Sequence, residues 1–151
     1  MRTVKDILDS KPQAFNVIRP DAMVIDGLNM LNSVNLSYLI VMDGNEYLGI
    51  FSERDYSRNV VLKGRSSRTS TVAEVMTVDL PVVHLHDTVE QCMLVMNSFR
   101  TRYLLAYDEQ DKFKGVITIH DLLRQVLTSK EAVFDTTVAE QLLSHDERGI
   151  Y

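Results

Sequence analysis

The sequence predicts an α/β (α+β) fold made of two pseudo-symmetric units, each running helix, strand, helix, strand, strand, helix. The main observation is a repeated heptapeptide: Gly-Ile-Phe-Ser-Glu-Arg-Asp at 49–55 returns as Gly-Val-Ile-Thr-Ile-His-Asp at 115–121. Outside this motif, Tyr38-Leu39 returns as Tyr103-Leu104 in the matching position. Such self-similarity indicates a duplicated structural unit. Strands that alternate with helices, with one hairpin per copy, indicate the α/β class.

The elements of the first copy follow from its apolar pattern. A helix is expected near residues 3–8, and a short strand at 14–18 is ended by Arg-Pro-Asp. Val24, Leu28 and Leu31 then recur at helical spacing. Strands at 38–42 and 47–51 flank an Asp-Gly turn, which is a hairpin signal. A helix at 56–61 closes the copy, so the heptapeptide joins a strand to a helix.

The second copy repeats this order. Residues 71–76 match the opening helix, and a strand is expected at 81–85. The next helix carries the apolar stripe Val89, Met93, Met96 and Phe99, which we interpret as core. Strands at 103–107 and 113–117 and a helix at 122–127 complete the copy. Beyond it, residues 128–146 are predicted to form one or two helices that pack on the body or on a second subunit.

These assignments divide the chain into unit 1 (1–62), a linker (63–70), unit 2 (71–128) and a helical tail (129–151). Each unit has roughly 60 residues, close to the lower limit for independent folding, so the halves are expected to pack on each other. The linker is polar and basic. It is either a solvated connection or a loop that contacts phosphate through Lys63 and Arg65.

Composition excludes several classes of function. A net charge of −5 gives no electrostatic reason to expect a nucleic acid as partner. No apolar run reaches the ~18–20 residues of a membrane span, and the first residues lack the apolar core of a secretion signal. Cys92 is the single cysteine, so no intrachain disulfide can form and a cytoplasmic location is expected.

The heptapeptide itself has two interpretations. A Ser or Thr three residues before an acid is also the capping box of a helix, which needs no ligand. The same geometry suits a nucleotide, because a carboxylate accepts from both hydroxyls of a ribose while helix amides hold phosphate. The occurrence of Ser52 with Asp55, and of Thr118 with Asp121, in two matching copies favours ligand binding.

Other candidate residues are weaker. Arg54 either pairs with phosphate or faces solvent, and His120 is expected to be an ordinary histidine at a helix start, although it is kept as a candidate contact. His84 and His86 share one strand face, but spacing alone does not make a metal site, and none is expected. Cys92 falls on the amphipathic helix and is expected to be a buried thiol.

With these motifs, the chain resembles the tandem CBS domains known as a Bateman module, over about residues 3–128. The stretch 49–67 is similar to stand-alone CBS-pair proteins. The resemblance implies two units packed sheet to sheet, with clefts between them that bind AMP, ADP, ATP or NAD(H). It places Ser52 and Asp55 in one cleft and Thr118 and Asp121 in the other.

Departures from the family pattern affect the expected base-binding wall. The second strand of these domains often reads His-Leu-Pro-Val, and here the walls would be Tyr38 with Leu39 and Tyr103 with Leu104. The missing proline leaves the choice among adenine nucleotides open.

The leading hypothesis is therefore a regulatory module that senses adenine nucleotides, forms a homodimer and acts on an unidentified protein. The alternative is a protein-interaction scaffold with vestigial clefts. No nucleophile–base pair, phosphate-binding Walker loop or metal cluster in the sequence supports an enzyme, and no catalytic cofactor is expected.

Overall fold

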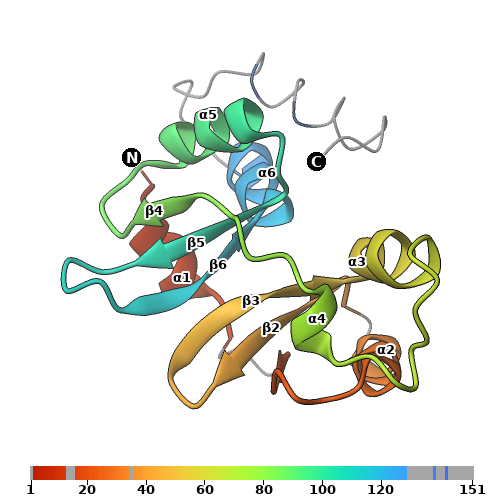
Figure 1. Cartoon of the computed structure of the whole chain (residues 1–151). Coiled ribbons are helices and arrows are strands. Elements are labelled where there is room, and N and C mark those ends of the chain that lie inside the picture. Colours follow the sequence, from red (N-terminus) through yellow and green to blue (C-terminus); the bar gives the residue numbers. More distant parts are fainter. Residues whose placement is uncertain (1, 13–15, 35, 129–137, 139–141, 143–151) are drawn as a thin grey trace. The chain divides into compact units, whose positions relative to one another are not determined.

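The computed structural model describes residues 2–12, 16–34, 36–128, Val138 and Leu142. It divides into two compact units, which Figure 1 shows as two separate three-stranded sheets with their helices. One comprises Gln13–Asp79 and is called the Asp55 unit below. The other comprises Met1–Pro12 together with Leu80–Tyr151 and is called the Asp121 unit.

The Asp55 unit has a sheet in the order β1-β2-β3. Its strands are β1 (Val17–Ile18), β2 (Tyr38–Asp43) and β3 (Glu46–Ser52), and its helices are α2 (Val24–Val34), α3 (Glu53–Asp55), the π-helix η1 (Tyr56–Val61) and α4 (Val72–Val75). β1 pairs with β2 in parallel, and β2 pairs with β3 in antiparallel register. The predicted hairpin is confirmed, and Gly44 at its tip has a φ of 62°, a conformation that glycine adopts without steric cost.

The core of this unit lies between the sheet and its helices. It contains Ile18, Val24, Leu31, Leu39, Val41, Phe51, Val60, Val72 and Val75. Because successive strand residues point to opposite faces, Leu39 and Val41 both reach this core from β2. The ring of Phe51 is fully buried, at the end of the strand that leads into α3.

The Asp121 unit has the same sheet topology, in the order β4-β5-β6. Its strands are β4 (Val82–His84), β5 (Tyr103–Tyr107) and β6 (Phe113–Thr118), and its helices are α1 (Val4–Ser10), α5 (Val89–Phe99) and α6 (Ile119–Thr128). Capping boxes start α1 at Thr3 and α5 at Thr88. The stripe residues Val89, Met93 and Met96 are buried in its core as predicted, whereas Phe99 is 66% exposed.

The opening helix of each repeat packs on the sheet of the other repeat. Val4 and Ile7 of α1 belong to the core of the Asp121 unit, and α1 contacts β6 (Figure 1). Val72 and Val75 of α4 belong to the core of the Asp55 unit. The compact units and the sequence repeats therefore divide the chain at different points.

Three segments differ in detail from the sequence-based expectations. The first strand is limited to β1, and residues 14 and 15 lie outside the described part of the chain. The helix after Asp55 continues as a π-helix, in which the amide of Leu62 donates to the carbonyl of Ser57. Most of the tail also lies outside the described residues, but Val138 and Leu142 are buried in the core of the Asp121 unit.

The segment 63–70 lies against the start of α2. The amide of Ile25 donates to the carbonyl of Ser67 at 2.9 Å, and the amide of Val24 donates to that of Ser70 at the same distance. Among the described residues, no helix is long and apolar enough to cross a membrane.

Candidate functional site

The first heptapeptide places Ser52 and Asp55 where β3 passes into α3. Asp55 Oδ2 accepts from the backbone amide of Ser52 at 2.8 Å and from its hydroxyl at 3.0 Å. In return the amide of Asp55 donates to Ser52 Oγ at 3.3 Å. Both side chains are buried, at 6% exposure each. This is a complete capping box, so the interpretation of the motif as a helix cap is confirmed at this junction.

The second heptapeptide repeats this geometry where β6 passes into α6. Asp121 Oδ2 accepts from the amide of Thr118 at 2.9 Å, and the amide of Asp121 donates to Thr118 Oγ1 at 3.2 Å. Asp121 is 6% exposed and Thr118 is 8% exposed. The two copies therefore hold a carboxylate and a hydroxyl in equivalent positions, one in each unit.

Each carboxylate has a further partner that the motif does not predict. Thr77 Oγ1 donates to Asp55 Oδ1 at 2.6 Å. Lys11 Nζ donates to Asp121 Oδ2 at 2.9 Å. Thr77 and Lys11 do not fall at matching positions of the repeat, since Lys11 aligns with Asp79, and the internal symmetry therefore gave no signal for either residue.

The glycine that opens the first motif allows one of these partners to approach. An added Cβ on Gly49 would come within 2.8 Å of the carbonyl oxygen of Thr77 and of the sulfur of Met76. Ile50 and Thr77 form an antiparallel bridge, with backbone bonds of 2.9 and 2.8 Å. Gly49 therefore permits the close backbone contact that presents Thr77 to Asp55.

Burial and hydrogen bonding act in opposite directions on Asp55. Desolvation raises its carboxyl pKa above the ordinary 3.8, while hydrogen bonds from Thr77 and Ser52 and the charge of Arg58 partly offset the rise. Asp6 stands in the same capping box on α1 but is less buried, and hydrogen bonds from Thr3 lower its pKa. The same motif thus gives opposite pKa shifts, and burial decides the sign.

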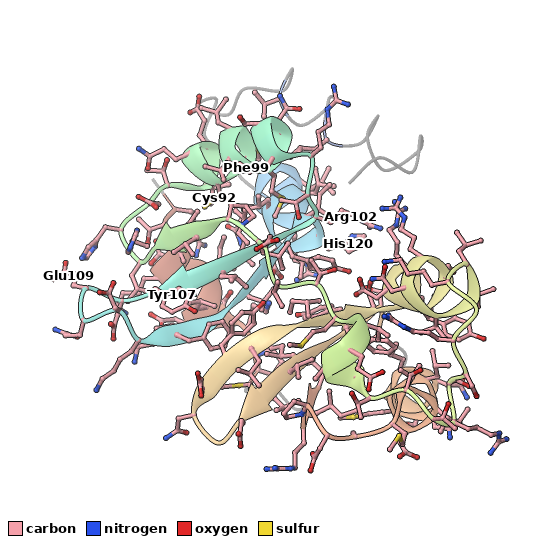
Figure 2. All side chains as sticks on the ribbon, in the orientation of Figure 1. Cys92, Phe99, Arg102, Tyr107, Glu109 and His120 are labelled. Atoms are coloured by element: carbon pink, nitrogen blue, oxygen red, sulfur yellow. The ribbon has the colours of Figure 1, made fainter. Side chains whose placement is uncertain are left out.

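The remaining candidate residues are distributed around these junctions. Arg54 lies within α3, directly before Asp55, and His120 lies in the first turn of α6, where Arg102 Nη2 is 3.3 Å from its Nε2 (Figure 2). Arg65 donates to the carbonyls of Asn59 at 3.2 Å and Glu74 at 3.3 Å.

The predicted wall residues differ in exposure. Leu39 and Leu104 have no exposed surface and belong to the two cores. Tyr38 is half-buried and Tyr103 is 8% exposed, each on the strand that neighbours its motif. Lys63 is exposed, just beyond η1. The wall roles of the two tyrosines and two leucines, and the phosphate role of Lys63, stay predictions.

The two junctions have the donors and acceptors that a ribose requires. A carboxylate offers about four lone-pair directions, of which the described contacts take three at Asp55 and two at Asp121. Both keep acceptor capacity for a hydroxyl, and each stands beside the first turn of a helix. In the described part of the chain no three His, Cys, Asp or Glu side chains converge as metal ligands. His86 lies on the surface, where its Nε2 is 3.0 Å from Glu109 Oε1.

The fold and the two junctions define a duplicated α/β protein with a Ser/Thr–Asp pair where the last strand of each sheet passes into a helix. The model of the CBS domain matches residues 4–61 and 72–128. The chain belongs to the CBS domain family and carries two copies of the domain in tandem.

Relatives of this family match most of the chain. A protein with CBS domains from Burkholderia ambifaria is 32% identical, with a TM-score of 0.76, over 88% of this chain and 99% of that one. CBSX2, solved in complex with AMP, is 26% identical, with a TM-score of 0.70, over 87% and 100%. The mitochondrial CBS domain-containing protein CBSX3 of Arabidopsis thaliana is 28% identical over 134 residues, which are 83% of this chain and 65% of that protein.

Proposed function

We propose that this protein is a regulatory module that binds adenine nucleotides at its two strand-to-helix junctions. Asp55 and Asp121 accept hydrogen bonds from the ribose hydroxyls, and Ser52 and Thr118 contact phosphate or ribose. AMP, ADP, ATP and NAD(H) are the candidate ligands. The output passes to another protein or to self-association of this chain.

The observation that carries the proposal is the duplicated geometry of the two carboxylates. Both are buried to about the same extent, both are oriented by the amide of the residue three positions earlier, and both retain acceptor capacity. A capping box needs none of this remaining capacity, whereas a ribose diol uses it. The AMP complex of the related CBSX2 supports an adenine nucleotide as the ligand class.

The test is titration calorimetry with AMP, ATP and NADH on the wild type, Asp55→Ala and Asp121→Ala. Loss of a charge-assisted hydrogen bond should weaken the altered site by roughly 1.5–3 kcal/mol, about ten- to a hundredfold. Asp43→Ala is the matched control, because Asp43 is an exposed aspartate of the Asp55 unit. Mass spectrometry of small molecules released by denaturation identifies any nucleotide that co-purifies.

Capping alone predicts a different result. Each Asp→Ala change would then lower the free energy of unfolding by about 1 kcal/mol and leave nucleotide affinity unchanged. A wild-type protein that carries no prebound ligand and binds none of the three nucleotides at millimolar concentration would refute the proposal. The interaction-scaffold hypothesis would then replace it.

A further inference from the structure

The two junctions share a capping box but differ in charge, because their additional partners differ. Asp55 receives a neutral hydroxyl from Thr77, whereas Asp121 receives the ammonium of Lys11 at 2.9 Å. The Asp121 side chain is 7% exposed and that of Lys11 is 25% exposed, so solvent screens this ion pair only in part. Among the described contacts, the carboxylate of Asp121 is therefore paired with a cation, and that of Asp55 accepts from neutral donors.

Lys11 is fixed in position by the fold. It directly follows α1, where its backbone amide donates to the carbonyl of Leu8. Its Nζ also donates to the carbonyl of Val116 at 2.9 Å, on the strand that ends at Thr118. An ammonium has three donors, and these described contacts occupy two of them. The third is available for an oxygen atom of a ligand beside the start of α6.

Other cations gather around the same helix start. Arg124 Nη1 lies 3.9 Å from Asp121 Oδ1. The carbonyl of Arg102 accepts from the amide of Ile119 at 2.9 Å, which places Arg102 beside the first turn of α6, next to His120 (Figure 2). Two permanent cations, Lys11 and Arg124, thus lie within 4 Å of one carboxylate, and Arg102 lies beside the same helix start.

The corresponding junction of the Asp55 unit has two acidic side chains in its first turn, whereas the first turn of α6 has one. Glu53 and Asp55 stand in α3 together with Arg54, and Arg58 follows one turn later. Two carboxylates therefore accompany two guanidinium groups. We therefore expect an anionic ligand to gain more electrostatic free energy beside α6 than beside α3, by an amount that grows with the number of phosphates.

We propose that Lys11 is a specificity residue that makes the Thr118/Asp121 site select nucleotides with a di- or triphosphate, while the Ser52/Asp55 site takes monophosphates. When a ribose hydroxyl donates to Asp121, the ammonium of Lys11 gives its third donor to a phosphate oxygen. The inference rests on the proposed nucleotide binding and adds which site takes which charge state.

The experiment compares Lys11→Gln, Lys11→Arg and Lys5→Gln with the wild type. Lys5→Gln is the matched control, because Lys5 lies on the same helix α1 and pairs with Asp9 on the exposed surface at 2.7 Å. Each protein is titrated with AMP and ATP in the presence of EDTA, so that ATP keeps its full charge. Amide NMR shifts of Ile119 and His120 report one site, and those of Glu53 and Arg54 report the other.

Lys11→Gln should weaken ATP at the Thr118/Asp121 site by about tenfold and AMP by less than about threefold, because only the polyphosphate loses a charge-assisted bond. Lys11→Arg should retain the preference for ATP, and Lys5→Gln should match the wild type. At the Ser52/Asp55 site all four proteins should bind alike.

Two results overturn the inference and leave nucleotide binding intact. One is that Lys11→Gln loses the same affinity for AMP as for ATP, or that it loses no affinity and is only less stable. The other is a wild type that binds ATP more tightly at Ser52/Asp55 than at Thr118/Asp121. Failure of the wild type to bind either nucleotide refutes the proposed function itself, and the wild-type titration alone reveals that case. If Lys11→Gln does not fold, Lys11→Arg and the site preference of the wild type still decide the question.

Discussion

Thr77 Oγ1 donates a 2.6 Å hydrogen bond to Asp55 Oδ1, joining the segment after α4 to the end of β3. The carboxylate of Asp55 is thereby held from two sides, by Ser52 on Oδ2 and by Thr77 on Oδ1. The pKa of this carboxyl is raised by burial, and the bond from Thr77 is the largest influence that opposes the rise. Thr77 therefore helps to fix the position of the proposed ribose acceptor and partly offsets the rise of its pKa.

Replacement of Thr77 by valine should destabilise the Asp55 unit. Valine keeps the shape but removes the donor, so a buried carboxylate oxygen loses a partner at a cost of about 1–3 kcal/mol. Urea unfolding measures this loss. Thr69→Val is the control, because Thr69 is exposed in the same unit and should change stability by less than about 0.5 kcal/mol. Equal stabilities of the two variants would show that the hydrogen bond contributes nothing measurable.

The opposite pKa shifts of Asp55 and Asp6 predict opposite pH dependence. Because the pKa of Asp55 is raised in the folded state, the folded protein binds this proton more tightly than the unfolded chain. Relative to Asp55→Asn, the wild type should be most stable below pH 3.8 and should lose this advantage as the pH rises through the folded-state pKa. The measurement is urea unfolding at a series of pH values between 3 and 7.

Asp6→Asn provides the comparison with the reverse sign. The pKa of Asp6 is lowered, so its stabilising contribution is present above pH 3.8 and is lost as the pH falls through the folded-state value. The two difference curves should therefore have opposite slopes. Parallel curves would contradict the assignment of burial as the dominant influence on Asp55.

Replacement of Gly49 by alanine should separate β3 from the Thr77 segment. The new Cβ would come within 2.8 Å of the Thr77 carbonyl, and backbone cannot move aside as the end of a side chain can. A loss of about 1–3 kcal/mol is expected, as for other overpacking substitutions. Urea unfolding measures the loss, and the amide shifts of Ser52 and Asp55 should change with it. An unchanged spectrum at this junction would exclude the proposed role of Gly49.

Cys92 should resist alkylation in the folded protein. It is fully buried on α5, and burial raises the pKa of its thiol to about 12. At pH 8 the reagent therefore cannot reach the sulfur, and the thiol is not in its reactive thiolate form. Mass spectrometry after iodoacetamide treatment should show modification only once the protein is unfolded in denaturant. Free glutathione in the same tube serves as the reactivity control. Rapid labelling without denaturant would reveal an opening of the Asp121 unit around α5.

We expect a homodimer that uses the exposed apolar residues of α5 and α6. In the described part of the chain Leu94 is 50% exposed, Phe99 is 66% exposed and Leu127 is 85% exposed. Light scattering at tens of micromolar should give twice the monomer mass, since modest interfaces commonly have micromolar affinities. Leu94→Glu combined with Phe99→Glu should give a monomer.

Val61→Glu is the control for this surface, because Val61 is 54% exposed on η1 in the other unit. It should leave the mass unchanged. A wild type that is monomeric with and without nucleotide would contradict the expected dimer.

The sequence by itself determined the duplication, the α/β class, both hairpins and the two Ser/Thr–Asp junctions. These features depend on neighbours in the chain: apolar periodicity, an Asp-Gly turn and a capping box are read within a few residues. The strands at 38–42 and 103–107 were therefore predicted to within a residue of the observed β2 and β5.

The tertiary structure alone decided what each junction contacts. Helix α1 packs on the second sheet and α4 packs on the first. This packing brings Lys11 to Asp121, 110 residues apart in the sequence, and Thr77 to Asp55, 22 residues apart. Burial then sets the direction of the pKa shift of Asp55. Such long-range contacts depend on how whole apolar faces cover one another, and no local pattern around Lys11 or Thr77 encodes that choice.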